Sequence, residues 1–174
     1  MRYISTIISF LLLSGCLGMP ESVKPVNGFD LNRYLGKWYE IARLDHSFER
    51  GLGQVTAEYA LKENGGVSVL NRGYSQSKDK WQEAQGKAYF VKSSSEGYLK
   101  VSFFGPFYGS YVVFELDKDY QHAFISGPST EYLWLLSRKP SVKPEILEQF
   151  ISMSKARGFA TEGLILAAQQ EQLR

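Results

Sequence analysis

Cysteine and histidine are scarce in this sequence: Cys16 is the only cysteine among 174 residues, and His46 and His122 are the only histidines. One cysteine cannot form a disulfide within the chain, so a hydrophobic core must hold the fold together. The two histidines do not have the spacing of a metal site, and no metal or cofactor is expected. The formal net charge of +2 contains no block of basic residues, which argues against nucleic acid as a partner.

The first sixteen residues have the pattern of a bacterial lipoprotein signal. Arg2 precedes an apolar stretch over residues 4–13 that is too short to span a bilayer, and Leu-Ser-Gly-Cys follows at residues 13–16. In lipoproteins the cysteine after the cut is acylated, so we expect Cys16 to be lipidated. One acyl chain binds a membrane only weakly, at about 10⁴ M⁻¹, whereas two or three hold firmly. The alternative is an ordinary signal peptide with an incidental cysteine.

The expected order along the chain is a signal peptide, a lipid anchor, a linker and one domain. Removal of residues 1–15 leaves 159 of the 174 residues, which is the size of one domain. Residues 16–28 contain two prolines and no periodic apolar pattern, so they are expected to be the lipidated N-terminus and a linker to the domain of residues 29–174. Leu17 follows the cysteine, rather than the aspartate that retains many Gram-negative lipoproteins at the inner membrane. That resemblance implies an outer-membrane location, lipid-anchored and facing the periplasm.

Short segments of alternating apolar and polar residues follow one another from residue 37 to residue 138. The clearest examples are residues 54–61, 67–72, 82–90 and 98–103. Asn-Gly-Gly at residues 64–66 is a strong tight-turn signal between the first two of these segments. Period-two alternation at such short spacing predicts an antiparallel meander with one solvated face. Seven or eight such strands can pack as a sandwich or close as a barrel, and closure would leave room for one small ligand.

One helix is predicted after the strands. Pro144 suits its first position, Glu145 suits the positive end of the helix dipole, and Gly158 ends it. An apolar stripe at helical spacing consists of Ile146, Leu147, Phe150, Ile151 and Met153. The strand over residues 37–44 offers it a surface, because its outward positions Tyr39 and Ile41 are apolar, with Lys37 and Arg43 at their border. We therefore expect the helix on the outside of the sheet.

Three short motifs carry a resemblance to a known family. Residues 36–43, Gly-Lys-Trp-Tyr-Glu-Ile-Ala-Arg, are similar to the first lipocalin motif, Gly-x-Trp. Residues 135–140, Leu-Leu-Ser-Arg-Lys-Pro, resemble the third motif at the end of the last barrel strand. Residues 116–120, Leu-Asp-Lys-Asp-Tyr, resemble the second motif, Thr-Asp-Tyr, with leucine in place of threonine and the aspartate and tyrosine separated. That departure concerns the geometry of one turn.

Two longer stretches narrow the resemblance. Residues 45–51 and 101–109 are similar to the bacterial outer-membrane lipocalins, which are close kin of apolipoprotein D. The resemblance covers roughly residues 30–170. It implies an all-β fold, an eight-stranded antiparallel up-and-down barrel with one C-terminal α-helix packed outside.

Gly36, Trp38 and Arg138 are expected to close the barrel at one end. Alternation places Trp134, Leu136 and Arg138 on one face of the last strand, and Trp38 would face the same end. A guanidinium over an indole contributes about 0.5–2 kcal/mol, more when shielded from water. In lipocalins such a pair seals the bottom of the barrel, so a structural role is expected for these residues rather than contact with a ligand.

The interior is predicted to bind an acyl chain, that of a fatty acid or a lysophospholipid. The small inward residues Ala57, Ala84, Gly86 and Ala88 favour a cavity, and the wall is mostly apolar with a few polar points. Plain core packing is the alternative for each wall residue. The predicted ligand-binding residues are Ala57, Tyr59, Val69, Asn71, Ala88, Phe90, Val101, Phe103, Tyr111, Val113, Trp134 and Leu136, and alternation adds Val55, Ala84 and Ile125 to the inner face.

Two loops have alternative interpretations. In the loop of residues 45–53, Phe48 and Leu52 could form an apolar lid and Arg50 could meet an anionic head group, or all three could simply be solvated. The aromatic hairpin tip of residues 104–109 could touch the membrane, pair with a second protomer as a homodimer, or fold onto its own strand.

These observations predict a carrier rather than an enzyme. Asp45, His46 and Glu49 lie close together in sequence, but no serine stands in a nucleophile turn beside them. We expect passive sequestration or transport of a lipid, and the subfamily resemblance implies a role in cell-envelope maintenance. The alternative is a scaffold or interaction lipoprotein of the outer membrane that transports no ligand.

Overall fold

Eight antiparallel strands close into a barrel in the computed structural model, which describes residues 17–167. Each strand pairs with the next, and β1 pairs with both β2 and β8, which closes the sheet. The barrel expectation is therefore confirmed, and the sandwich is excluded. The strands are β1 (Gly36–Leu44), β2 (Leu52–Leu61), β3 (Val67–Ser75), β4 (Lys80–Phe90), β5 (Tyr98–Ser102), β6 (Gly109–Leu116), β7 (His122–Ser126) and β8 (Leu133–Ser137).

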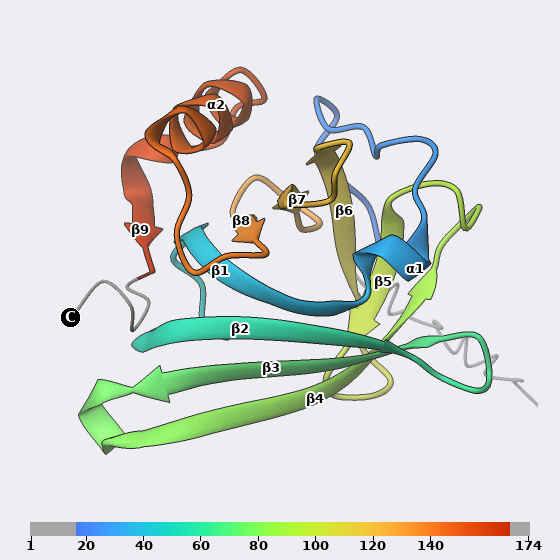
Figure 1. The fold of residues 1–174 in the computed structure, drawn as a ribbon, viewed down its shortest axis with the longest axis horizontal. Coiled ribbons are helices and arrows are strands. Elements are labelled where there is room, and N and C mark those ends of the chain that lie inside the picture. The colour runs from blue at the N-terminus through green and yellow to red at the C-terminus, as the bar shows by residue number, and fades with distance from the viewer. Residues whose placement is uncertain (1–16, 168–174) are drawn as a thin grey trace, which may run out of the picture.

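The strands β2, β3 and β4 form one side of the barrel (Figure 1). The predicted tight turn joins β2 to β3, with Lys62 N donating to Gly66 O and Gly65 at a φ of 77°. A short 3₁₀ turn, Gln76–Lys78, joins β3 to β4 at the other end. The described pairing of β4 with β5 covers only residues 87–90, so residues 80–86 have no such partner on that side. The barrel wall is therefore incomplete near this end, which we call the mouth.

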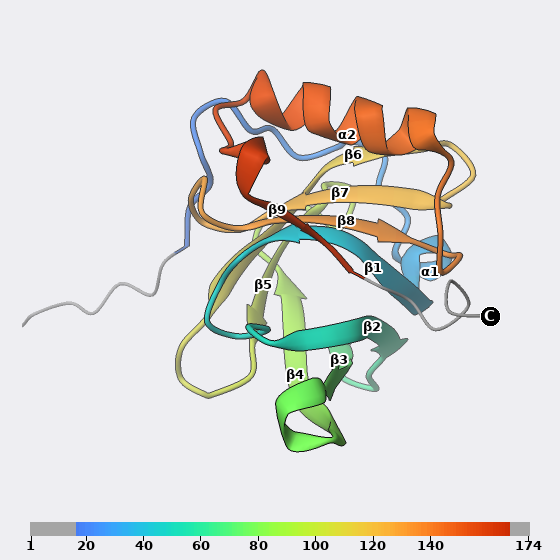
Figure 2. The same cartoon turned by 90° about the vertical axis from the view of Figure 1, so that its left-hand side faces the viewer.

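The helix α2 (Pro144–Lys155) lies against the outside of the barrel across β6, β7 and β8 (Figure 2). Pro144 stands at the start of the helix as expected, and Phe150 is fully buried. The Phe150 ring lies 5.1 Å from the Phe124 ring, centroid to centroid. Ile146, Leu147, Ile151 and Met153 pack against the same outer cluster. The predicted position of the helix is confirmed.

A ninth strand, β9 (Leu164–Leu166), follows a 3₁₀ turn, Thr161–Gly163, and was not expected from the sequence. It pairs with β1 on the side away from β8, beyond the stretch of β1 that pairs with β2, with Ala42 opposite Leu166. Three apolar residues are too few to show a period, which is why the alternation rule missed it. Within the described part of the chain no helix is long and apolar enough to cross a membrane.

A bulge in β1 overturns the expected direction of Arg43. Glu40 pairs with Leu136 and Ala42 with Leu135, so Ile41 is an extra residue on β1. A bulge reverses the faces of all residues beyond it. Ile41 and Ala42 therefore both pack against the outer cluster, and Arg43, expected at the outer border, is buried opposite Trp134.

The segment expected to be a linker is packed against the barrel from residue 18 onward. Val23 is 2% exposed, Val26 N donates to Val113 O, and Gly97 N donates to Val26 O, each at 2.9 Å. Asn27 forms an isolated bridge with Glu96. This part of the chain is therefore a fixed strap rather than a flexible spacer. The predicted signal peptide, residues 1–15, and the predicted lipidation site Cys16 lie outside the described residues.

Candidate functional site

The closed end of the barrel is built around Trp38 and Arg138. The Arg138 guanidinium carbon lies 4.0 Å from the centroid of the Trp38 ring, so the predicted contact is present. Arg138 also donates to the backbone oxygens of Lys37 at 2.9 Å and Arg33 at 2.7 Å. Gly36 has a φ of 90°, and a Cβ there would lie 3.5 Å from Arg138 Nη1, so glycine suits this position.

A short helix, α1 (Leu31–Tyr34), closes the floor of the barrel from inside. The Asp30 carboxylate caps it by accepting from Asn32 N at 3.0 Å, as expected for a capped turn. The Trp38 indole donates from Nε1 to the Tyr34 backbone oxygen at 2.8 Å. The carbonyl end of α1 is therefore satisfied by the indole and by Arg138, which explains why both side chains are needed at this end.

The degenerate second motif still builds its turn. The Asp117 carboxylate accepts from the backbone nitrogens of Asp119, Gln121 and His122. Tyr120 has a φ of 57°, and its hydroxyl accepts from Asp30 N at 2.9 Å. The separated aspartate and tyrosine thus still anchor the turn and tie it to α1.

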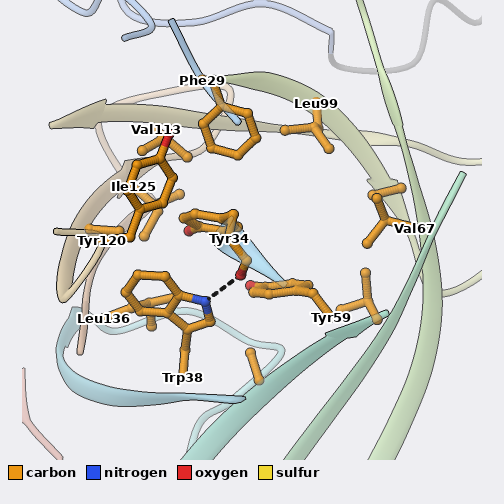
Figure 3. Close-up of a cluster of buried hydrophobic side chains, with 14 residues drawn as sticks. Phe29, Tyr34, Trp38, Tyr59, Val67, Leu99, Val113, Tyr120, Ile125 and Leu136 are labelled. Atoms are coloured by element: carbon orange, nitrogen blue, oxygen red, sulfur yellow. Dashed lines mark hydrogen bonds between the residues drawn. The ribbon is translucent and has the colours of Figure 1, made fainter. Parts of the chain in front are cut away.

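Three tyrosine hydroxyls meet inside the barrel above the closed end. The hydroxyl of Tyr111 lies 2.7 Å from that of Tyr34 and 2.9 Å from that of Tyr59. Figure 3 shows Tyr34 above the Trp38 ring and Tyr59 beside it. Burial is the main reason that the pKa values of Tyr34, Tyr59 and Tyr111 are raised above the ordinary value. The three phenols therefore stay neutral at physiological pH.

Most of the predicted wall residues lie together in one inner cluster. Its buried members include Ala57, Tyr59, Val69, Ala88, Val113, Ile125 and Leu136, and Phe90, Val101, Phe103, Tyr111 and Trp134 pack against them partly buried. Asn71 shares the inner face with Ala57, and its Oδ1 is buried with no hydrogen-bond partner among the described residues. Ala84 differs: it is exposed, because it lies where β4 lacks a partner on the β5 side.

The interior is more completely filled than the small inward residues predict. A cavity of about 20 Å³ remains at the deep end, which is room for about one water molecule. A Cβ on Gly86 would lie 2.8 Å from Phe103 Cδ1, so the Phe103 ring occupies the space that this glycine leaves. The residues that line the cavity are Phe29, Leu31, Tyr34, Tyr59, Val67, Ala88, Leu99, Val101 and Tyr111.

A buried charged cluster lies inside the wall on the mouth side, and sequence reasoning missed it. Arg43 Nη1 donates to Glu40 Oε1 at 2.5 Å, and both side chains are only 2% exposed. Arg43 Nη2 donates to the backbone oxygens of Glu49 and Leu52, each at 3.0 Å. Glu40 was detectable as inward, since it alternates with Trp38, whereas the bulge that turns Arg43 inward leaves no local signal.

His46 and Glu49 extend this cluster into the loop between β1 and β2. His46 Nε2 lies 3.1 Å from Glu49 Oε2, and the same oxygen accepts from Trp134 Nε1 at 3.1 Å. Both side chains are largely buried, although the sequence suggested an exposed loop. Burial and the neighbouring Glu49 carboxyl raise the pKa of Glu40. Hydrogen bonds from His46 and Trp134 outweigh burial and lower the pKa of Glu49. Glu49 is therefore the more acidic of the two carboxyls.

The outer surface of the same loop is solvated. Arg50 forms an exposed ion pair with Asp45, with Nη2 and Oδ2 2.8 Å apart, and Phe48 is exposed. Leu52 is half-buried against Gly73, where a Cβ would lie 3.1 Å from its side chain. No group of three or more His, Cys, Asp or Glu side chains within residues 17–167 is placed to hold a metal ion. The arrangement is thus an apolar interior bordered on the mouth side by the buried charged cluster.

Comparisons with known proteins agree with this architecture. Residues 29–169 match the family described as Lipocalin-like domain. The chain is 70% identical to the outer membrane lipoprotein Blc of Vibrio cholerae over 171 residues, which are 98% of this chain and 100% of that protein. It is 49% identical over 150 residues to the Escherichia coli K12 protein of the same name, covering 86% and 85% of the two chains.

Among solved structures, insecticyanin from the tobacco hornworm Manduca sexta superposes with a TM-score of 0.70. The match covers 89% of this chain and 88% of insecticyanin at 21% identity, so it bears on the fold alone. The sequence relatives cover nearly the whole chain and carry the family resemblance seen in its motifs. The chain therefore belongs to the lipocalin family and is an outer-membrane lipoprotein.

Proposed function

We propose that this protein binds the acyl chain of a fatty acid or lysophospholipid inside its barrel and carries it without chemical change. The observation that supports this proposal is the apolar inner wall around the deep cavity. The barrel wall is also incomplete at the mouth, which offers an entrance. Each buried CH₂ contributes about 0.8 kcal/mol, so a long acyl chain has ample gross driving force. Lipid held in this way would serve envelope maintenance on the periplasmic face of the outer membrane.

Binding requires side chains to move, because the cavity of about 20 Å³ cannot hold an acyl chain. Phe103 is the side chain best placed to move. It is only partly buried, packs against Gly86 and lies at the end of β5, next to the unpaired part of β4. Rotation of its ring toward solvent would open the wall above Val101, which lines the cavity. Entry beside β4 is therefore part of the proposal.

We propose that the polar end of the lipid lies near the mouth. Asn71 lies on the inner wall, and its unpartnered Oδ1 can accept a hydrogen bond from a ligand hydroxyl. Arg43 is already committed to Glu40 and to two backbone oxygens, so it is not the proposed head-group contact. A glycerol hydroxyl, which a lysophospholipid has and a fatty acid lacks, suits Asn71 best.

Three tryptophans at different depths provide the test. Trp38 is fully buried at the closed end, Trp134 lies on the inner wall toward the mouth, and Trp81 is partly exposed on β4. Single-tryptophan variants, made with phenylalanine at the other two positions, are titrated with fatty acids brominated at different carbons. Bromine near the carboxyl end should quench Trp134 most, and bromine near the methyl end should quench Trp38 most. Equal quenching of all three would show surface adsorption instead.

A matched pair of substitutions tests the cavity. Val101→Phe fills the deep cavity from the inner face of β5, and Lys100→Phe adds the same ring to the outer face one residue away. We expect the first to abolish stoichiometric lipid binding and the second to preserve it. Circular dichroism and urea unfolding check that both variants are folded.

The scaffold alternative is favoured by one observation, the small volume left inside the barrel. It predicts that protein purified from its membrane carries no lipid by native mass spectrometry and that no lipid can be titrated into it. The carrier proposal predicts about one lipid per chain. Absence of lipid in both measurements would leave the scaffold role.

A further inference from the structure

We propose that the three tyrosine hydroxyls inside the barrel form a polar subsite that binds an oxygen atom carried on the acyl chain itself. The ligand class is an oxygenated acyl chain, with a hydroxyl or keto group in the half of the chain nearer its methyl end. The inference rests on the proposed lipid carriage and narrows its substrate class. It depends on how many protons the hydroxyls share, how deeply they are buried, and how far they lie below Asn71.

The tyrosine cluster, Tyr34, Tyr59 and Tyr111, has one more proton than it can use internally. The Tyr111 hydroxyl lies 2.7 Å from that of Tyr34 and 2.9 Å from that of Tyr59, so three hydroxyls share two hydrogen bonds. Each bond uses one proton, whichever oxygen donates. These hydroxyls have no further hydrogen-bond partner among residues 17–167. One O–H donor is therefore without an acceptor in every arrangement of the protons.

The unpaired donor lies where water does not reach it. Tyr34 and Tyr59 are 3% and 7% exposed, and Tyr111 packs against the same inner cluster. The cavity beside them is bordered by all three tyrosines but has an apolar surface. A water molecule there would lack the two to four polar partners, or about three, that a buried water needs. Because a buried donor without an acceptor is unfavourable, a ligand oxygen that accepts this proton should bind favourably.

The tyrosine cluster suits a neutral oxygen rather than a carboxylate. Burial raises the pKa values of all three phenols, so they remain O–H donors at physiological pH. A carboxylate at this depth would lose its hydration without gaining a free cation, because Arg138 is committed to two backbone oxygens and to the Trp38 ring. The carboxyl end of a fatty acid should therefore stay at the mouth, and the oxygen that meets the cluster belongs to the chain.

The depth of the tyrosine cluster determines where on the chain this oxygen must be. Asn71, the proposed head-group contact, lies opposite Ala57 on β2. Tyr59 follows two residues later, opposite Gly36 at the closed end. At about 3.4 Å per residue, the Cα atom of Tyr59 is about 7 Å deeper than that of Ala57. An oxygen near the carboxyl stays at the level of Asn71, whereas one in the methyl half of the chain reaches the cluster.

The tyrosine cluster and a plain apolar cavity predict effects of opposite sign. In an apolar cavity a hydroxyl on the chain weakens binding, because it loses water without gaining a partner. Against the cluster the same oxygen accepts the unpaired proton, and one net hydrogen bond corresponds to about three- to tenfold in affinity. A keto oxygen only accepts, and it should serve as well as a hydroxyl because the unpaired group is a donor.

Calorimetric titration of the mature protein tests the sign. The probes are stearic acid and two stearic acids with a hydroxyl or a keto group in the methyl half of the chain. We expect both oxygenated acids to bind about three- to tenfold more tightly than stearic acid. If stearic acid binds as tightly or more tightly, the inference is wrong and the carrier function stands. If none of the three acids binds, both are wrong.

The triple variant Tyr34→Phe/Tyr59→Phe/Tyr111→Phe tests whether the hydroxyls cause the effect. All three must be replaced, because any single replacement still leaves at least one unpaired proton. Replacing every partner of a hydrogen bond by an apolar group is nearly neutral for stability, so the variant should fold, as circular dichroism checks. It should bind both oxygenated acids more weakly than stearic acid. An order of affinities unchanged from wild type would overturn the inference.

Two controls accompany the triple variant. Tyr98→Phe removes a buried hydroxyl from the outer cluster and should keep the wild-type order of affinities. A stearic acid with its keto group near the carboxyl is the positional control. Its affinity relative to stearic acid should be the same in the wild-type protein and the triple variant, because its oxygen does not reach the tyrosine cluster.

Infrared spectroscopy detects the hydrogen bond directly and needs no variant. The keto acid is labelled isotopically at its keto carbon, so that its carbonyl band is separated from those of the protein. Bound to the wild-type protein, this band should lie at lower frequency than in hexane, because a hydrogen bond to the oxygen weakens the C=O bond. A band at the hexane position would overturn the inference whatever the affinities.

Discussion

At its closed end the barrel is sealed by neutral aromatic groups around one guanidinium, whereas toward its mouth four ionisable side chains are buried in and beside the wall. The closed end pairs Arg138 with backbone oxygens and with the Trp38 ring. The mouth pairs Arg43 and His46 with Glu40 and Glu49, two carboxyls with opposite pKa shifts.

The two ends therefore differ in how their interactions depend on pH. Arg138 meets carbonyl dipoles, which do not titrate, so the closed end keeps its bonds over a wide pH range. Arg43 holds the loop between β1 and β2 through Glu49 O and Leu52 O, while Glu40 and Glu49 next to it change charge in acid. The loop between β1 and β2, at the mouth, is thus held next to carboxyl groups whose charge changes with pH.

Alkaline pH is expected to produce the largest effect, and it acts on the closed end. The pKa values of Tyr34, Tyr59 and Tyr111 are raised by burial, so the unfolded chain loses its phenol protons first, above about pH 10. Each tyrosine then removes about 1.4 kcal/mol of stability per pH unit, or about 4 kcal/mol for the three. The stability is fully present below about pH 10 and is lost as pH rises toward the folded pKa values. Urea unfolding between pH 8 and 11 measures the slope.

The control for that slope is a pair of variants. Tyr111→Phe removes one of the three phenols and should reduce the slope by about a third. Val113→Ala destabilises the same interior by making a cavity and should leave the slope unchanged. Equal slopes in both variants would show that these phenols do not control the alkaline transition.

Removal of the seal itself is the second test. Trp38→Ala should cost about 3–5 kcal/mol in the free energy of unfolding, because a fully buried ring is lost and Arg138 loses its partner. Trp81→Ala on the partly exposed side of β4 should cost less than about 1 kcal/mol. Chemical denaturation of both variants measures the contrast. Similar losses would mean that the closed end contributes no special stability.

The smallest expected effect belongs to the mouth. Glu49→Gln should cost about 1–3 kcal/mol at pH 7, because His46 and Trp134 lose an ionised acceptor. The pKa of Glu49 is lowered in the fold, so its contribution is present above the unfolded value of about 4.3 and lost as pH falls. The variant and wild-type proteins should therefore converge in acid, as measured by thermal unfolding between pH 3 and 7.

Glu40→Gln is the matched variant with the opposite sign. The raised pKa of Glu40 makes its contribution favourable in acid and progressively unfavourable as pH rises above about 4.3. The amide cannot ionise, so the variant should gain stability relative to wild type between pH 4 and 7. A loss over that interval would reverse the assignment of the two carboxyls.

The fold was predictable because the signals that specify it are local. Alternation in residues 54–61 and 67–72, with a glycine turn between them, fixes a hairpin without reference to the rest of the chain. The apolar stripe of α2 and the outward-facing Tyr39 are likewise visible in the sequence, and together they predict that the helix packs on the outside of the barrel. The contact between Trp38 and Arg138 came from the family resemblance, and the register of β1 against β8 brings the two together.

The candidate site was less predictable because its shape depends on contacts between residues that are far apart in the sequence. The Phe103 ring fills the space beside Gly86, and alternation does not encode how side chains fill such space. The strap is fixed by backbone bonds of Val26 to Val113 and Gly97, while its prolines suggested a free spacer. The bulge at Ile41 reverses Arg43 without any change in the apolar pattern around it.

The bulge residue Ile41 changes which side of β1 the following residues face, and so divides the strand between the inner and the outer hydrophobic clusters. Before it, Trp38 and Glu40 face the barrel interior, and after it Ala42 and Leu44 face α2. Removing Ile41 would restore regular alternation and leave Arg43 inward and Leu44 outward, whereas a regular strand that kept Ile41 would send Leu44 into the barrel and Arg43 under the helix. The bulge therefore keeps Arg43 in the barrel and Leu44 in the outer cluster, and grafts or truncations meant to reshape the entrance belong in the loops on either side of β1.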